Sequence, residues 1–301
     1  MELKIRPLPP FDFSLSSQIF SLGDRRVRRY ENGVFWQAAR LSERLALLRV
    51  HSTGTVEEPE LSVEIVPEEG LSDKDRKAAK SLVVRLFNLD LDLLPFYEAV
   101  RGDRIMARLT SLLRGLKSPS TATVFEALID SIIEQQISLR AAWSMQMRLM
   151  EAFGDVLTLN GQTYLVFPRP KSLATATIEQ LRGCGLSGRK AEYVRDVSQL
   201  VTEGLDLEGL RSYDEQSIIE EMNKIRGVGI WTAEMIMIRG MQKFDAIPAD
   251  DLGLRRVISH YYYAERRITG QEARSAAEAW KGWRGLASFY LIMAEQLKIE
   301  V

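Results

Sequence analysis

The residues whose types and spacing could do chemistry are a pair of glycines and, further along the chain, a pair of aspartates. Gly227 and Gly229 separate two segments with helical apolar spacing, which indicates a tight turn between two helices. The backbone N–H groups of Gly227, Gly229 and Ile230 then lack helical acceptors, and such donors favour an anion such as a DNA phosphate. Asp250 and Asp251 open a later helical segment. The spacing predicts a phosphate-binding turn followed by a reactive carboxylate.

Both features also have ordinary structural explanations. An all-α protein would use glycine in a plain connection between helices, and Asp is among the best helix N-caps. The segment with Leu252, Leu254 and Val257 has helical spacing, so one of the two aspartates is expected to cap it. Capping and catalysis are compatible, because N–H donors and the positive end of a helix keep a carboxylate ionised.

The composition is that of a globular chain. Its 301 residues are 46% hydrophobic and 27% charged, which suits two domains with sizeable cores and excludes disordered and fibrous classes. No apolar stretch is long enough to span a membrane and no signal peptide is visible, so we expect a soluble, cytoplasmic protein. The single cysteine, Cys184, excludes an internal disulfide and a four-cysteine iron–sulfur cluster, and it is expected in the core.

The charge does not predict broad electrostatic binding of nucleic acid. A formal charge of −1 and a pI near 6.3 leave room only for a local basic face. The side chains that could form such a face, or could equally be solvated helix charges, are Arg189, Lys190, Arg226, Arg255 and Arg256. The only two histidines of the sequence, His51 and His260, lie far apart along the chain, which argues against a histidine zinc site or a histidine-based nucleophile relay. No P-loop or dinucleotide-binding fingerprint is present.

Residues 1–88 are predicted to form a domain of strands with a covering helix. Asn32 and Gly33 lie between apolar runs, which is the strongest short signal for a β-hairpin. Further strands are expected over 45–50 and 61–66, and a capped helix follows them. The predicted fold class is therefore α+β, with a small antiparallel sheet at the N-terminus.

Residues 89–301 are predicted to be mostly α-helical. Apolar residues recur at helical spacing over 125–133, and Ser138 can cap the next helix. The glycine turn and its two helices are expected over about 218–240. A loop over about 241–252 then leads to the aspartates.

With these elements in place, the sequence resembles a known family. The run 225–231 and the Gly- and Pro-containing loop before Asp251 are similar to the helix-hairpin-helix DNA glycosylases, and within them to the 3-methyladenine DNA glycosylase II branch. The resemblance covers roughly residues 85–301. It implies a base excision repair enzyme that flips a damaged purine, above all an alkylated one, out of duplex DNA and hydrolyses its N-glycosidic bond.

The resemblance implies that Asp251 is catalytic. The invariant Asp of the family stands five residues before an Arg-apolar pair, which here is Arg256 and Val257, and Asp250 fits this register less well. Asp251 would support positive charge on the deoxyribose and orient the attacking water, and whether Asp250 shares this work stays open. Trp231 stands where strand-nicking members carry a lysine nucleophile, which implies a monofunctional enzyme without lyase activity.

The implied base pocket is apolar and only partly aromatic. Its lining would be Trp231, Met235, Leu252 and Ile292. An indole can stack on an extruded base and attracts a cationic base more strongly, although Trp231 could also be a plain core residue. Because Met235 and Ile292 stand where the family has aromatic residues, an oxidised or deaminated purine stays open as the lesion.

The resemblance also assigns contacts with the duplex. Gln136, which could otherwise be an exposed loop residue, matches the wedge that fills the gap left by the flipped base. The carbonyls of Asn223, Ile225 and Val228 match those that hold a structural Na⁺ or K⁺ beneath the hairpin, and no other cofactor is expected.

The expected partner is double-stranded DNA containing a damaged base. No membrane or protein partner is indicated, and we expect a monomer associated with the nucleoid. The alternatives are a helix-hairpin-helix module that binds DNA without catalysis and, more remotely, an all-α protein that does not bind DNA.

Overall fold

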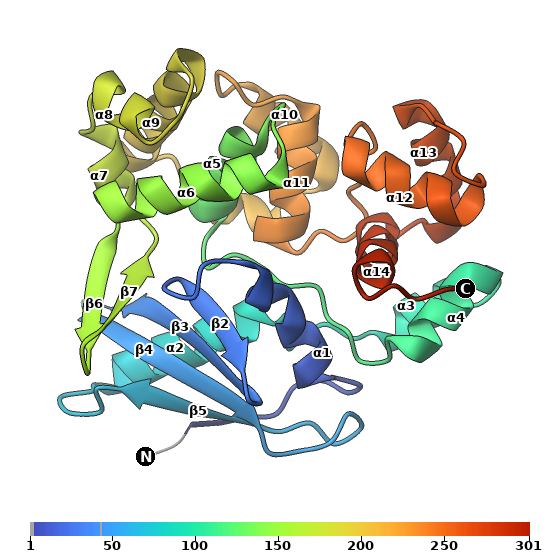
Figure 1. Ribbon diagram of the computed structural model, residues 1–301, viewed down its shortest axis with the longest axis horizontal. Coiled ribbons are helices and arrows are strands. Elements are labelled where there is room, and N and C mark those ends of the chain that lie inside the picture. The colour runs from blue at the N-terminus through green and yellow to red at the C-terminus, as the bar shows by residue number, and fades with distance from the viewer. Residues whose placement is uncertain (1–2, 43) are drawn as a thin grey trace.

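The fold combines an N-terminal sheet with a larger helical part (Figure 1). The structure is a computed structural model that describes residues 3–42 and 44–301. The arrangement confirms the predicted α+β class. Within the described ranges, no helix has the length and hydrophobicity that crossing a bilayer requires.

The N-terminal strands form an antiparallel sheet. They are β1 (Leu3–Ile5), β2 (Arg28–Glu31), β3 (Val34–Leu41), β4 (Arg44–Ser52) and β5 (Leu61–Val66). Their order in the sheet is β1-β5-β4-β3-β2. The turn between β2 and β3 is the predicted hairpin, in which Asn32 and Gly33 take φ angles of 51° and 76°. The short strand β1 was not predicted.

The helices account for most of the remaining chain. They are α1 (Phe13–Gln18), α2 (Asp73–Leu86), α3 (Leu94–Val100), α4 (Arg104–Leu112), α5 (Val124–Glu134), α6 (Leu139–Phe153), α7 (Pro170–Ala174), α8 (Ile178–Gly183), α9 (Gly188–Thr202), α10 (Glu215–Asn223), α11 (Ile230–Met241), α12 (Leu252–Tyr262), α13 (Gly270–Ala277) and α14 (Arg284–Gln296). Short 3₁₀ helices cover Ile19–Leu22, Gly209–Ser212 and Glu278–Trp280.

Helix α2 covers the sheet. It begins with a capping box in which Ser72 accepts the N–H of Asp75 and the Asp75 carboxylate accepts the N–H of Ser72. Ala79, Val83 and Leu86 lie on one face of the helix and are fully buried in the core that it shares with the sheet. The apolar face of α2 therefore closes the N-terminal core.

A second hairpin interrupts the helical part. Its strands are β6 (Asp155–Leu159) and β7 (Gln162–Val166), and its turn residues Asn160 and Gly161 have φ angles of 49° and 76°. Strand β7 packs on the N-terminal sheet through a small apolar cluster with β3 and β4. The expectation of a nearly continuous helical region missed this hairpin, although Asn160-Gly161 carries the same signal as Asn32-Gly33.

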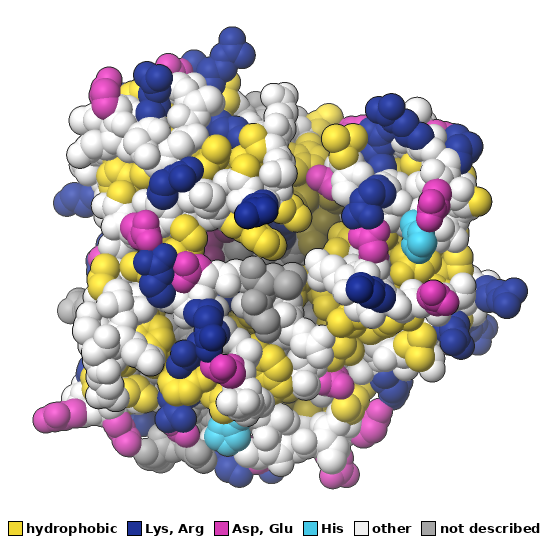
Figure 2. Space-filling model, in the orientation of Figure 1, with side chains coloured by type: hydrophobic (Ala, Val, Ile, Leu, Met, Phe, Trp, Pro, Cys, Tyr) yellow, Lys and Arg dark blue, Asp and Glu magenta, His cyan; other side chains and the backbone are white. Residues whose placement is uncertain are grey.

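The helices form two packed groups. Buried side chains of α5–α11 make one apolar cluster, and those of α3, α4 and α12–α14 make another. The face shown in Figure 2 is hollowed between these two groups. The predicted hairpin and the predicted catalytic aspartate lie in different groups, so the loop between α11 and α12 decides how they face each other.

That loop is tied to both groups. Ala246 belongs to the apolar cluster of α5–α11, whereas Phe244 and Ile247 belong to the other cluster. The carbonyl of Phe244 accepts the N–H of Gly285 at 2.8 Å, at the start of α14. A Cβ at Gly285 would lie 2.5 Å from the carbonyl oxygen of Ala246, so glycine permits this close approach.

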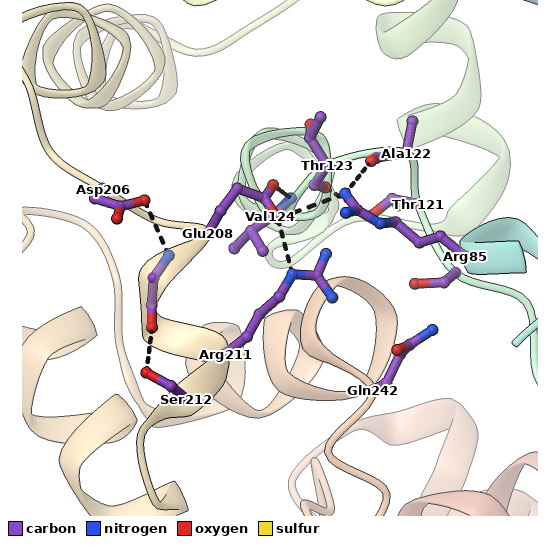
Figure 3. A network of polar contacts seen from close by, with 12 residues as sticks. Arg85, Thr121, Ala122, Thr123, Val124, Asp206, Glu208, Arg211, Ser212 and Gln242 are labelled. Atoms are coloured by element: carbon purple, nitrogen blue, oxygen red, sulfur yellow. Dashed lines mark hydrogen bonds and ion pairs between the residues drawn. The ribbon is translucent and has the colours of Figure 1, made fainter. Parts of the chain in front are cut away.

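The N-terminus of α5 is held from two sides (Figure 3). The Glu208 carboxylate accepts the N–H of Val124 at 2.7 Å and the guanidinium of Arg211 at 2.8 Å. From α2, Arg85 donates to the carbonyl of Ala122 at 2.7 Å. Helix α5 is therefore fixed where it begins, and its other end leads to the predicted wedge.

Candidate active site

The glycine turn between α10 and α11 is tighter than a plain helix connection. Gly227 has a φ of +88°, in the left-handed region that L side chains rarely adopt. Gly229 is the N-cap of α11 and has an extended backbone, with φ −105° and ψ −178°; it supplies no side-chain acceptor. The first N–H groups of α11 therefore lack helical acceptors, and Ile230, which begins the helix, is 55% exposed. The two helices span 215–241, close to the predicted range of 218–240.

Helix α9 holds this turn in place. A Cβ at Gly227 would lie 2.3 Å from the ring carbon Cδ2 of Tyr193, so the turn backbone packs directly on the tyrosine ring. The neighbouring Arg226 stacks over the same ring with its guanidinium carbon 5.4 Å from the centroid. Arg226 also pairs with Glu192 at 2.8 Å and with Asp196 at 3.5 Å.

Asp251 is the N-cap of α12. Its Oδ1 accepts the N–H of Leu254 at 2.9 Å, and the residue is partly buried. In the described part of the chain, its Oδ2 has no hydrogen-bond partner, so one oxygen caps the helix and the other is free. Both expectations for this carboxylate, capping and availability for chemistry, are compatible with this arrangement.

The carboxylate of Asp250 lies against a different helix, α13. A Cβ at Gly270, the first residue of α13, would lie 2.0 Å from Oδ1 of Asp250, so this carboxylate rests against the start of that helix. The Asp250 side chain is exposed. The two adjacent carboxylates thus contact different helices, and Asp250 has a structural contact of its own.

Arg239 on α11 brings positive charge close to Asp251. Its guanidinium pairs with Glu134 at the end of α5, at 2.6 Å. Burial lowers the pKa of Arg239, but the negative charges of Glu134, Asp130 and Asp251 outweigh burial and raise it. The guanidinium therefore stays charged between the end of α5 and the catalytic candidate.

A row of carboxylates on α5 accompanies this arginine. Glu126, Asp130 and Glu134 recur at four-residue spacing, and Arg28 of β2 pairs with Glu126 at 3.0 Å. Burial raises the pKa of Asp130 well above its usual range, and the two neighbouring carboxylates add to this effect. Neither Arg239 nor this row was predicted to bear on the site. The four-residue spacing was the sequence signal that could have drawn attention to them.

The predicted pocket residues lie on three helices. Trp231 and Met235 are one turn apart on α11, partly buried and 8% exposed respectively. Ile292 is a partly buried residue of α14. Leu252 is 71% exposed at the start of α12, so it can contribute only to the outer edge of a pocket. Gln136 is exposed, and its φ of +56° belongs to the left-handed region.

A half-open cavity of about 330 Å³ lies away from these residues, between the N-terminal sheet and the start of α5. Its arginines are engaged within the protein. Arg28 pairs with Glu126, and both Arg40 and Arg169 pair with Asp155. This cavity is a junction between the sheet and the helices and does not coincide with the predicted base pocket.

Sequence comparison identifies the family. Residues 129–283 match the model for the HhH-GPD superfamily of base excision DNA repair proteins. The chain belongs to this superfamily. The DNA-3-methyladenine glycosylase of Bacillus subtilis (strain 168) is 34% identical to this HhH-GPD protein over 206 residues, which cover 68% of each chain. DNA-3-methyladenine glycosylase 2 of Escherichia coli (strain K12) is 26% identical over 196 residues, covering 63% of this chain and 64% of the relative.

Solved structures extend the similarity to the whole HhH-GPD chain. A 3-methyladenine DNA glycosylase from Archaeoglobus fulgidus superposes with a TM-score of 0.84 and 25% identity, over 99% of this chain and 100% of that one. An 8-oxoguanine glycosylase/lyase from Clostridium acetobutylicum bound to DNA has a TM-score of 0.74 at 21% identity, which shows the fold alone. The HhH-GPD protein is a base excision repair DNA glycosylase, and the non-enzymatic alternatives are set aside.

Most of the basic residues that were candidates for a DNA-binding face form hydrogen bonds or ion pairs within the glycosylase. Arg226 pairs with α9, and Lys190 donates to main-chain carbonyls at the end of α5. Arg255 donates to the carbonyl of Ile268, and Arg256 pairs with Glu295. Arg189 is exposed, and it makes no ion pair with any described residue. Four of the five candidate side chains therefore have partners within the protein.

Gly227→Ala is expected to reduce the free energy of unfolding by more than about 1 kcal/mol. The left-handed backbone alone costs an L residue about that amount, and the ring of Tyr193 leaves no room for a Cβ. Gly229→Ala is the matched control, because its backbone is extended and a Cβ there meets nothing within 4 Å. Urea denaturation compares the two variants, and equal stability would contradict the constraint.

An ion pair with a buried carboxylate joins α11 to α13. Glu234 is 5% exposed and accepts a hydrogen bond from Arg274 at 2.9 Å. Burial raises the pKa of Glu234 to about 7; Arg274 opposes this rise, and Asp250 and Glu215 add to it. The folded protein therefore binds the Glu234 proton more tightly than the unfolded chain does.

Glu234 is expected to make stability depend on pH. A carboxyl whose pKa is raised from 4.5 to about 7 contributes stability that is complete below pH 4.5 and is lost as the pH rises through 7. Measured from pH 4.5 to 8, the Tm of Glu234→Gln should therefore improve relative to wild type as the pH rises. Glu179→Gln, at an exposed position of α8, serves as the control. Parallel curves for wild type and Glu234→Gln would rule out this contribution.

Proposed function

We propose that this glycosylase removes an alkylated purine from duplex DNA with water and leaves an abasic site without cutting the strand. The observation that carries the proposal is Asp251, which caps α12 through Oδ1 and keeps Oδ2 free. The names of the relatives from B. subtilis and E. coli, both 3-methyladenine glycosylases, support the substrate class.

The chemistry follows from the position of Asp251 at a helix start. When the bond between the purine and C1′ breaks, its electron pair leaves with the base and positive charge develops on the sugar. An ionised carboxylate stabilises this charge, orients the water whose oxygen bonds to C1′, and accepts the proton that this water loses before passing it to solvent. The N–H of Leu254 at the start of α12 holds the Asp251 carboxylate in place through Oδ1.

Trp231 supports both the substrate class and the use of water. It is the second residue of α11 and is partly buried. An indole stacks on an extruded base and attracts a cationic, alkylated purine more strongly than a neutral one. An indole cannot form a Schiff base with the sugar, so Trp231 offers no route to strand cleavage.

The aliphatic side chains of the proposed pocket are also compatible with a second class of substrate, the uncharged damaged purines. Met235 and Ile292 provide contact without π-stacking, which reduces the advantage of a cationic base. Oxidised and deaminated purines are therefore included in the test below.

We also propose a structural Na⁺ or K⁺ beneath the hairpin, held by the carbonyls of Asn223, Ile225 and Val228. Asn223 ends α10, and the Ile225 carbonyl accepts the N–H of Val228 at 3.0 Å while keeping a second lone pair. Neutral carbonyl oxygens suit a hard cation, and a bound ion would add positive charge beneath a DNA phosphate.

The cation proposal predicts a higher Tm in potassium or sodium chloride than in N-methylglucamine chloride of equal ionic strength. Binding to the folded state alone stabilises it by mass action. Equal values of Tm in the three salts would argue against the ion.

Asp251→Asn is expected to slow base release by at least about 10²-fold, the effect of removing one electrostatic group from a transition state. Asn is also a good N-cap, so the fold is preserved. The measurement is single-turnover release of free base from duplexes that carry 7-methylguanine, hypoxanthine or 8-oxoguanine. Fluorescence anisotropy reports duplex binding, which should persist in the variant.

Asp250→Asn is the control, because this neighbouring carboxylate rests against α13. Its rate should stay close to wild type. Full activity of Asp251→Asn would overturn the proposed role, and release confined to hypoxanthine or 8-oxoguanine would replace the substrate class. A borohydride-trapped adduct with DNA would exclude the monofunctional mechanism.

A further inference from the structure

The side chain of Gln135 joins the predicted wedge turn to the hairpin. Gln135 is the C-cap residue of α5, directly before Gln136. Its Nε2 donates to the carbonyl of Gly227 at 2.9 Å and to Oγ1 of Thr232 at 3.0 Å. A side-chain amide has two N–H donors, so both bonds form at once. One donor group therefore contacts the glycine turn and also the first turn of α11.

These bonds fix the peptide unit at the centre of the hairpin. The carbonyl of Gly227 is held by Gln135, and the N–H of Val228, on the other side of the same peptide plane, donates to the carbonyl of Ile225 at 3.0 Å. Because a peptide unit is planar, holding both groups prevents it from rotating. The N–H groups that follow, at the start of α11, keep their direction.

The other end of the link is held equally firmly. The ammonium group of Lys190, on α9, donates to the carbonyls of Ile133 at 2.7 Å and Gln135 at 2.6 Å. These carbonyls are among the last of α5, which have no helical donors. Gln136 follows with a φ of +56° and an exposed side chain. The bonds on either side of it help to keep a residue other than glycine in the left-handed region.

We propose that Gln135 is a positioning residue that sets the place of the wedge, Gln136, relative to the phosphate-binding N–H groups of the hairpin. The inference rests on the proposed flipping mechanism and on the wedge role of Gln136. Extruding a base requires the phosphate beside the nucleotide and the wedge in the stack to be held at the same time. Gln135 provides this coupling through hydrogen bonds to Gly227 and Thr232.

Gln135→Glu tests the link with little change in size. A carboxylate at this position loses both donors and places negative charge against the carbonyl of Gly227. Gln146→Met is the control, and its replacement is neutral because a carboxylate there would repel Glu134, the ion-pair partner of Arg239. Gln146 lies on α6, is also partly buried and contacts the same end of α5 through Glu134, but it makes no described contact with the hairpin. Thr232→Val removes one of the two acceptors and should have a smaller effect than Gln135→Glu.

The readout compares two duplexes with the same lesion, 7-methylguanine. In one the lesion faces cytosine, and in the other it faces a tetrahydrofuran abasic analogue, which leaves no partner base and a smaller cost of extrusion. For Gln135→Glu we expect single-turnover base release to fall by about 10²-fold in the paired duplex, the usual effect of misplacing a reacting group by about 1 Å. In the unpaired duplex we expect a much smaller loss. Gln146→Met should match wild type in both.

Two results would overturn the coupling: equal losses in both duplexes, which indicate general damage to the fold, or no loss in either. Thermal melts of each variant check the first result independently. If wild type releases no base at all, the proposed substrate fails, and duplex binding then tests the link by itself. In that case Gln135→Glu should lose preference for a duplex containing the abasic analogue over an undamaged duplex, and an unchanged preference would reject the link.

Discussion

The contact between the backbone of Gly227 and the ring of Tyr193 is the constraint on which the rest of the site depends. It leaves no space for a side chain and requires a left-handed backbone, which only glycine adopts without strain. Helix α9 thereby determines where α11 begins. Because Trp231, Met235 and Arg239 are all carried by α11, the positions of the two proposed pocket residues and of the half-buried guanidinium follow from this one close approach.

Two adjacent aspartates contact different helices, and one of them, the N-cap of α12, is the proposed catalytic group. Asp251 accepts the N–H of Leu254 at the start of α12 with one oxygen and leaves the other oxygen for a ligand. Asp250 rests against α13 instead. In the proposed mechanism the N-cap aspartate therefore has a structural and a chemical role, since the start of the helix supplies a donor to its carboxylate.

The distribution of charge explains how a chain with a net charge of −1 can have a DNA-binding surface. Arg226, Lys190 and Arg256 are bonded within the protein, and they orient the hairpin, the end of α5 and α12. In the proposed phosphate site the donors are main-chain N–H groups, which carry no net charge. The basic side chains thus contribute by holding those donors in position, and the balance of charges over the whole chain says little about the partner.

The sequence by itself determined the features that depend on neighbouring residues. The Asn32-Gly33 turn, the capping box at Ser72, the glycine hairpin and the cap before α12 are all local preferences of backbone or side chain, and the structure has each of them. The hairpin at Asn160-Gly161 had an equally local signal, and it was missed because the flanking residues were assigned the helical period of their surroundings.

Only the tertiary structure decided which distant groups meet. The bond from Gln135 to Gly227 crosses 92 positions of the chain, and the pair of Glu134 with Arg239 crosses 105. Asp250 contacts α13 and Asp251 contacts α12, and this difference likewise depends on where α13 packs. Such contacts leave no periodic pattern, because they arise from the packing of helices and not from the conformational preference of any one segment.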